Sequence, residues 1–170
     1  GDFLLDLSRI RNFSSLNTNV IDSVFLDFKI RNSNIFPSDF SNFYNKINKS
    51  YSEIWKFKSD IKGFVNELII ENSIFSNQEN LIKFESNLTN VFNKERDYSV
   101  DLNFETINIS SGTLNSIFPE IFGTIIPSSI KTLGKFKFDG YVLANPNEVK
   151  SKFNLRVQDG LINAYLNISD

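Results

Sequence analysis

Residues 135–142 read Lys-Phe-Lys-Phe-Asp-Gly-Tyr-Val, so apolar and polar side chains alternate at nearly every position. Alternation of this kind is typical of a β-strand with one face buried and the other in water. A similar basic and aromatic run, Lys-Phe-Lys-Ser-Asp-Ile-Lys-Gly-Phe-Val, occupies residues 56–65. Both stretches therefore predict amphipathic strands.

The same alternation recurs along most of the chain and predicts eight or nine strands. In a last, weaker run, Leu161, Asn163 and Tyr165 fall on one face, and the apolar residues that alternate with them fall on the other. The apolar side chains expected to share a face within each strand are Val24, Leu26, Phe28 and Ile30; Trp55, Phe57 and Ile61; Leu68, Ile70 and Ile74; Ile82, Phe84 and Leu88; Val100, Leu102 and Phe104; Phe136, Phe138 and Val142; Val149, Phe153, Leu155 and Val157; and Ile162, Ala164, Leu166 and Ile168.

Polar turn sequences separate these runs at 76–80, 93–97, 145–147 and 159–160. Asn, Asp, Gly and Pro dominate turns, and short connections join antiparallel neighbours. The sequence therefore predicts a mainly β fold of antiparallel, meandering strands.

Two segments break the alternation and predict short helices. In residues 37–49, Pro37 suits a first helical turn, and Phe40, Phe43, Tyr44 and Ile47 form one stripe. Residues 112–122 show similar spacing, although Pro119 requires a short or late helix. Residues 123–131 are expected to form a loop.

The chain also contains an internal similarity. Ile35-Phe36-Pro37 recurs as Ile117-Phe118-Pro119, and each copy is followed by a helical stretch and then by the basic and aromatic strand. We expect one β-rich segment over residues 1–170, made of two divergent repeats of roughly 80 residues, at about 20–92 and 98–170. The chain contains no Met and starts at Gly1, so we also expect an internal segment of a longer protein.

Composition excludes several kinds of chemistry. The chain has no Cys and no His, which removes disulfides, thiolate sites, imidazole bases and His-based zinc chemistry. With 18 basic and 20 acidic residues, it lacks the positive charge expected of a nucleic-acid binder. No apolar run approaches the ~18 residues of a membrane-spanning helix.

Paired carboxylates are the remaining catalytic option, as in Asp97 with Asp101 or Glu67 with Glu71. On a strand, side chains four residues apart share a face but lie ~13 Å from each other. That distance exceeds the carboxylate separations of glycosidases. We therefore expect a non-enzymatic protein without a cofactor or a metal. Lys56, Lys58 and Lys62 form either a solvated strand face or a site for an anionic headgroup.

The Phe-rich apolar faces are compatible with two architectures. In a closed β-sandwich or barrel they pack against one another and form a core. In an open, curved sheet they line a groove, which acyl chains could fill because each buried methylene contributes about 0.8 kcal/mol. The alternation does not distinguish these two possibilities.

The C-terminal stretch resembles envelope proteins of the TamB and AsmA type, particularly those of Bacteroidetes. The resemblance rests on residues 126–140, on residues 152–164 with Gly160-Leu161-Ile162-Asn163-Ala164, and on residues 54–74 with Gly63-Phe64-Val65-Asn66-Glu67-Leu68. It is good over 112–170, moderate over 36–92 and weak over 1–31. The quoted motif consists of common strand residues and contains no catalytic group.

This resemblance implies a curved, elongated, taco-like β-groove with an apolar interior and one or two short helices. It further implies a periplasmic segment of an inner-membrane-anchored protein that carries phospholipid acyl chains toward the outer membrane and supports outer-membrane assembly, with assembly proteins as partners. The alternative is a closed β-sandwich acting as an interaction or scaffold module of a secreted or cell-surface assembly. The predicted groove residues are Phe57, Ile61, Phe84, Leu102, Phe104, Phe136, Phe138, Phe153 and Leu155.

Overall fold

The computed structural model describes residues 24–42, 45–93, 96–120, 134–157 and 160–169. Its elements are β1 (Phe25–Ile35), the 3-10 helix η3 (Pro37–Asn42), β2 (Trp55–Phe64), β3 (Glu67–Ser76), β4 (Leu81–Thr89), β5 (Ser99–Ser110), α2 (Ser111–Ile117), β6 (Lys135–Asn145), β7 (Glu148–Val157) and β8 (Gly160–Ser169).

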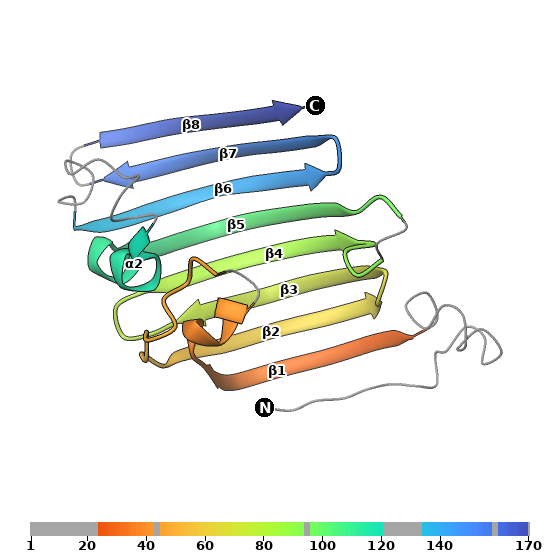
Figure 1. Ribbon diagram of the computed structural model, residues 1–170, viewed down its shortest axis with the longest axis horizontal. Coiled ribbons are helices and arrows are strands. Elements are labelled where there is room, and N and C mark those ends of the chain that lie inside the picture. The colour runs from red at the N-terminus through yellow and green to blue at the C-terminus, as the bar shows by residue number, and fades with distance from the viewer. Residues whose placement is uncertain (1–23, 43–44, 94–95, 121–133, 158–159, 170) are drawn as a thin grey trace.

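Within the described residues, eight strands form one open sheet in the order β1-β2-β3-β4-β5-β6-β7-β8, with β1 and β8 at its edges (Figure 1). Every neighbouring pair is antiparallel. The prediction of a mainly β, meandering antiparallel fold is confirmed. The closed β-sandwich is not formed by this part of the chain, because its strands join a single sheet whose first and last members do not pair.

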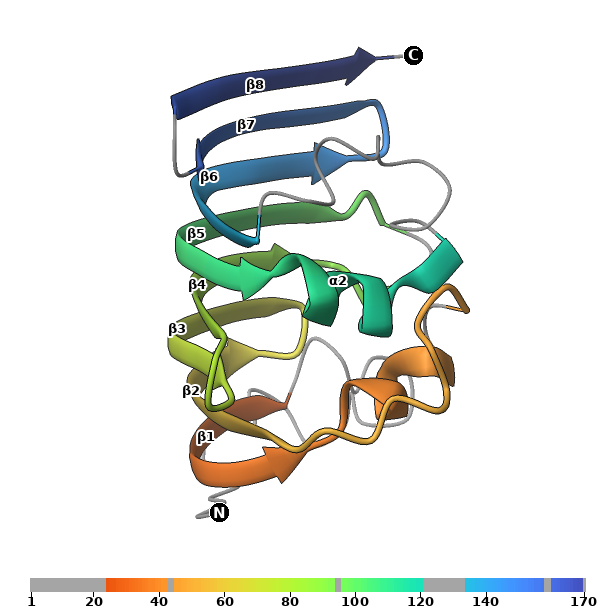
Figure 2. The ribbon, with the colours of Figure 1, turned by 90° about the vertical axis from the view of Figure 1, so that its left-hand side faces the viewer.

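The strands bend in their middle portions. Between β1 and β5 the pairing shifts in every strand pair. Three of these shifts contain an Asn with φ 51°: Asn32 in the β1–β2 pairing, and Asn72 in the β2–β3 and β3–β4 pairings. A further shift lies between Phe104 and Ile107 at the β5–β6 pairing. Extra residues of this kind are β-bulges, which bend a strand and increase its twist. Figure 2 shows the resulting curvature, with η3 and α2 on the side toward which the strands bend.

The bulges also explain one incorrect prediction. Ile74 was expected to share a face with Leu68 and Ile70, but it pairs with Lys58 and Lys83 on the opposite face. The bulge at Asn72 reverses the alternation, so Ser73 and Phe75 take the place that Ile74 was expected to fill.

The first predicted helix is shorter than expected, whereas the second, expected to be short or late because of Pro119, is the short helix α2. The first spans Pro37–Asn42 instead of 37–49, and Phe40 is exposed although it belongs to the predicted apolar stripe. Phe43 and Tyr44 lie outside the described residues, as do the predicted loop 123–131 and Asp159 of the last turn. The helix α2 begins at Ser111, where the side chain of Ser110 accepts a hydrogen bond from the N–H of Thr113 (3.0 Å). Ser is a preferred residue at this N-cap position.

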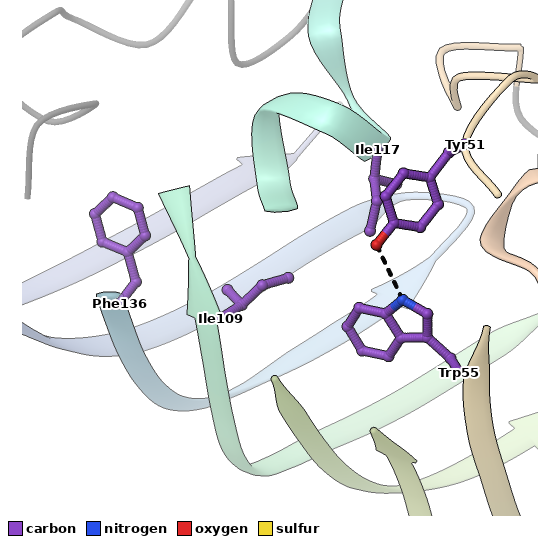
Figure 3. Packing of buried hydrophobic residues seen from close by; sticks show 5 residues of the cluster. All are labelled: Tyr51, Trp55, Ile109, Ile117 and Phe136. Carbon is purple, nitrogen blue, oxygen red and sulfur yellow. Dashed lines mark hydrogen bonds between the residues drawn. The ribbon is translucent and has the colours of Figure 1, made fainter. Parts of the chain in front are cut away.

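The core lies where α2 and the segment before β2 pack on the curved sheet. It contains Tyr51, Trp55, Ile109, Ile117 and Phe136 (Figure 3). The indole Nε1 of Trp55 donates to the hydroxyl of Tyr51 over 3.2 Å, so its single polar group is satisfied. Burial raises the pKa of Tyr51 to about 12, and the hydrogen bond to the Glu53 carboxylate acts in the same direction.

The order strand, short helix and three strands occurs twice, first from β1 to β4 and then from β5 to β8. In both halves the strand after the helix has a buried aromatic residue at its first or second position. In β2 this residue is Trp55, which pairs with Ile35, and in β6 it is Phe136, which pairs with Ile109. The Ile-Phe-Pro motifs differ in setting, because the first follows β1 and the second follows α2. A duplicated origin therefore stays a prediction.

Candidate functional site

The register places apolar side chains of all eight strands on one side of the sheet, which we call the apolar face. It is the side that α2 covers in part. Two of its rows cross the whole sheet through directly paired residues. These are Phe28, Ile61, Ile70, Ser86, Leu102, Val142, Ser151 and Leu166, and then Leu26, Gly63, Leu68, Leu88, Val100, Ala144, Val149 and Ile168.

All nine predicted groove residues lie on the apolar face. Ile61 and Leu102 belong to the first row given above, while Phe84, Phe104 and Phe153 lie beside it. Along the strands toward α2, the next residues of the set are Phe57, Phe138 and Leu155. Phe136, which pairs with Ile109, lies nearest to the α2 end of the sheet. The structure therefore brings the predicted set together from β2, β4, β5, β6 and β7.

Aromatic rings form the centre of this face. The ring of Phe104 lies 6.3 Å from that of Phe84 and 6.2 Å from that of Phe153. Gly140 of β6 pairs with both Phe104 and Phe153. A Cβ atom at Gly140 would lie 2.8 Å from Cδ1 of Phe153, so the missing side chain makes room for these rings to meet across β6.

Accessibility varies across the face. Phe136 is only 2% exposed and belongs to the core, so it offers almost no surface to a ligand. The other eight predicted residues are half-buried. On β8 the face is open, with Ile162, Leu166 and Ile168 about half exposed at 48%, 49% and 54%.

Three serines on this face, Ser59, Ser73 and Ser86, have their hydroxyl groups satisfied by other protein groups. The Oγ atoms of Ser59 and Ser73 are 2.9 Å apart, and both residues are fully buried. Ser86 donates to the carbonyl of Asp101 over 2.9 Å. Sequence analysis did not assign these serines to the site, because bulges and small polar residues interrupt a simple apolar pattern. Because their hydroxyls are already hydrogen-bonded within the protein, these serines leave the face apolar toward a ligand.

The opposite face is polar and charged. Lys56, Lys58 and Lys62 project there, in register with Asn34 and Asp27 of β1 and with residues of β3. They therefore lie on the other side of the sheet from Phe57 and Ile61. This position agrees with a solvated strand face and argues against contact with the headgroup of a ligand on the apolar face.

One carboxylate of the polar face has a perturbed pKa. Burial opposes ionisation of Asp60, but hydrogen bonds from Asn72 (3.0 Å) and Arg31 and the positive charge of Arg31 outweigh it and lower the pKa of Asp60. The Asp60 carboxylate lies 2.8 Å from the Arg31 guanidinium. This is a structural ion pair that joins β1, β2 and the bulge at Asn72.

Other chemical groups are dispersed. The predicted carboxylate pairs, Asp97 with Asp101 and Glu67 with Glu71, are solvent-exposed. The described part of the chain has no cluster of three His, Cys, Asp or Glu residues suited to a metal. A polar recess of about 920 Å³ lies at the β3–β4 turn, bordered by Glu53, Lys56, Asn77 and Glu79 among others.

Across the described ranges, no helix has both the length and the hydropathy needed to cross a bilayer. Comparison with protein-family models, curated proteins and solved structures finds no match to the chain.

Proposed function

We propose that the apolar face binds lipid acyl chains, and that the chain is a non-enzymatic structural segment along which such chains are held. The observation that carries the proposal is the continuous apolar face, which extends over all eight strands of an open sheet and is left half exposed at β8. Soluble proteins seldom leave a large contiguous apolar surface without a binding partner.

The chemistry of the face suits acyl chains better than polar ligands. Its side chains are aliphatic and aromatic, and the hydroxyls of Ser59, Ser73 and Ser86 are engaged within the protein. Binding would then depend on the area removed from water, at about 25 cal/mol per Å², and not on directed polar contacts. Headgroups would remain in water beyond the strand ends.

The wider setting belongs to the same proposal. The resemblance to TamB and AsmA proteins suggests a periplasmic segment in the bacterial envelope that carries phospholipid chains toward the outer membrane and cooperates with outer-membrane assembly proteins. The open, curved sheet is compatible with that setting. The described strands form one open sheet, which supports the groove over the closed scaffold module.

The direct experiment is native mass spectrometry of the purified chain, followed by lipid extraction and analysis. The wild-type chain is expected to retain phospholipid. The Phe104→Asp variant should lose it more than about tenfold, because a carboxylate on the binding surface loses hydration when tails cover it. Asn103→Asp is the matched control, since Asn103 is the exposed neighbour on the polar face.

A second pair of variants separates binding from folding. Leu166 is 49% exposed on an edge strand, so Leu166→Asp should leave the fold intact and still reduce lipid retention, whereas Asn167→Asp should not. A bare polypeptide mass from folded wild type would refute the proposal. Unchanged lipid in both folded apolar-face variants would refute it as well.

A further inference from the structure

The polar recess at the β3–β4 turn is a second concave feature of the molecule, and none of the nine predicted groove residues lines it. Its volume of about 920 Å³ falls within the range of about 300–1,000 Å³ that is typical of small-molecule sites. The lining consists of residues 52–54, Lys56, residues 76–80 and Thr113 of α2. Hydroxyl, amide, carboxylate and ammonium groups dominate it, and Ile54 adds an apolar side chain that is 52% exposed.

The turn that lines the recess is held in place by its own asparagines. The Oδ1 atom of Asn77 accepts from the backbone N–H groups of Glu79 (3.0 Å) and Asn80 (2.8 Å). Asn80 is only 3% exposed, donates to the Thr113 hydroxyl over 3.1 Å, and accepts from the backbone N–H of Ser110 over 2.8 Å. The turn is therefore anchored to β5 and α2. Binding to a recess formed in advance costs little conformational entropy.

Glu53 is the second fixed group of the recess. Its Oε2 atom accepts from the hydroxyl of Tyr51 (2.7 Å) and from Nδ2 of Asn77 (3.1 Å). Within the described ranges, its Oε1 atom has no hydrogen-bond partner. The same part of the chain offers no hydrogen-bond or ion-pair partner to three further side chains of the lining, those of Lys56, Gln78 and Glu79. A fixed frame thus presents groups that a ligand can engage.

The charges around the recess are balanced. The carboxylates of Glu53 and Glu79 carry negative charge, and the ammonium group of Lys56 carries positive charge. Lys135 brings a second ammonium group to the recess, because its Nζ donates to the backbone carbonyl of Glu79 over 3.3 Å. Two charges of each sign do not select a strongly charged ligand.

We propose that the recess binds a small uncharged polyol of the saccharide class. The groups left for a ligand include both donors and acceptors, and each hydroxyl of a saccharide donates one hydrogen bond and accepts others. Ile54 supplies the apolar contact for the C–H face of a sugar ring. The proposal is independent of lipid binding, because it uses residues outside the predicted groove set.

The single Trp of the chain reports on this site without a label. The indole Nε1 of Trp55 donates to the Tyr51 hydroxyl, as Figure 3 shows, and this hydroxyl donates to the Glu53 carboxylate. A ligand hydroxyl that donates to Glu53 weakens the acceptor at the end of this chain of hydrogen bonds. We therefore expect the emission of Trp55 to change on binding.

The test is a titration with glucose, galactose, mannose and N-acetylglucosamine, followed by Trp55 fluorescence and by isothermal titration calorimetry. At least one sugar is expected to bind with a dissociation constant of about 1 mM, since its hydrogen bonds to the protein largely replace hydrogen bonds to water. Glu79→Ala should raise this constant about tenfold at an unchanged melting temperature, because the Glu79 side chain is exposed and holds no other part of the described structure. Glu85→Ala is the matched control, an exposed carboxylate of β4 outside the recess.

A second titration checks that the ligand is uncharged. Binding of the sugar should not depend on salt, whereas attraction between charged groups weakens as salt is added. Ethanolamine and inorganic phosphate serve as the charged probes, and salt-sensitive binding of either one in place of the sugars would overturn the proposal.

Two further outcomes would overturn it. One is the absence of both heat and a fluorescence change with all four sugars in a folded sample. The other is an equal loss of affinity in Glu79→Ala and Glu85→Ala, which would locate binding outside the recess. Lipid retention should be unchanged in Glu79→Ala, so none of these outcomes bears on whether the apolar face binds acyl chains.

Discussion

Ser59 and Ser73 form a hydrogen bond between their hydroxyls within the apolar face, and its contribution to the free energy of unfolding can be measured. Ser73→Ala should destabilise the fold by about 1–2 kcal/mol, because the buried Ser59 hydroxyl loses its partner. Ser59→Ala should cost less, since Ser73 also lies 3.5 Å from the carbonyl of Glu71. The double variant should cost less than the sum of the two. Urea unfolding of all four chains measures the coupling, and strict additivity would contradict it.

Asp60 gives stability a defined dependence on pH. Its pKa is lowered in the folded state from 3.8, so its contribution is complete above the unfolded pKa and is lost as the pH falls through the lower folded value. Wild type should therefore exceed Asp60→Asn in unfolding free energy at pH 6. The difference should shrink below about pH 4, where the unfolded chain binds its proton first. A difference that stays constant between pH 6 and pH 2.5 would show that Asp60 acts through packing alone.

Single residues show where alternation predicts well and where it fails. Phe25 breaks the pattern of its strand, and the structure places it on the polar face with its ring edge-on to Phe64 at 5.2 Å. Phe136 fits the pattern fully yet belongs to the core, because α2 and Tyr51 come to its side of the sheet from elsewhere in the chain. The alternation assigns a face to each of these residues, but what covers that face depends on contacts distant in sequence.

At the scale of elements, the strands were predictable and their bends were not. Turn residues at 76–80 and 145–147 mark connections that the structure contains between β3 and β4 and between β6 and β7. The bulges at Asn32 and Asn72 leave no clear signal, since Asn is also common in strands of this chain. Ile107 and Ile109 were missed for the same reason, because the shift after Phe104 interrupts the alternation of β5.

Gly63 provides a test of how closely two elements approach each other. Its φ is +132°, and an added Cβ would lie 2.1 Å from the carbonyl oxygen of Glu67 in β3. Gly63→Ala should therefore destabilise the fold by more than about 1 kcal/mol, because the β2–β3 hairpin must open to relieve the contact. Gly160→Ala is the control: no atom lies within 4 Å of its added Cβ, and its effect should be within about 0.5 kcal/mol. Equal melting temperatures for the two variants would contradict this account.

For the whole molecule, the sequence could specify amphipathic strands but not whether their sheet would close. Closure depends on curvature and on the pairing of β1 with β8, and neither is encoded in local alternation. The bulges bend the strands, while β1 and β8 remain at opposite edges. In a sandwich the apolar face would be buried as the core, but in this open sheet it remains accessible. The candidate site and its proposed ligand both follow from this accessibility.

The two ends of the sheet should also contribute unequally to stability. β8 contributes no residue to the core, whereas Phe136, at the start of β6, is part of it and Phe138 and Leu155 pack against it. A chain ending at residue 159 should therefore still unfold cooperatively. Its unfolding free energy should fall by about 1 kcal/mol or less, which lowers the melting temperature by only a few degrees. A chain ending at residue 134 lacks these three side chains and should show no cooperative transition. Circular dichroism on heating measures both.

Loss of the cooperative transition in the chain ending at residue 159 would contradict this account, because it would assign β8 a part in the core that its exposure does not suggest.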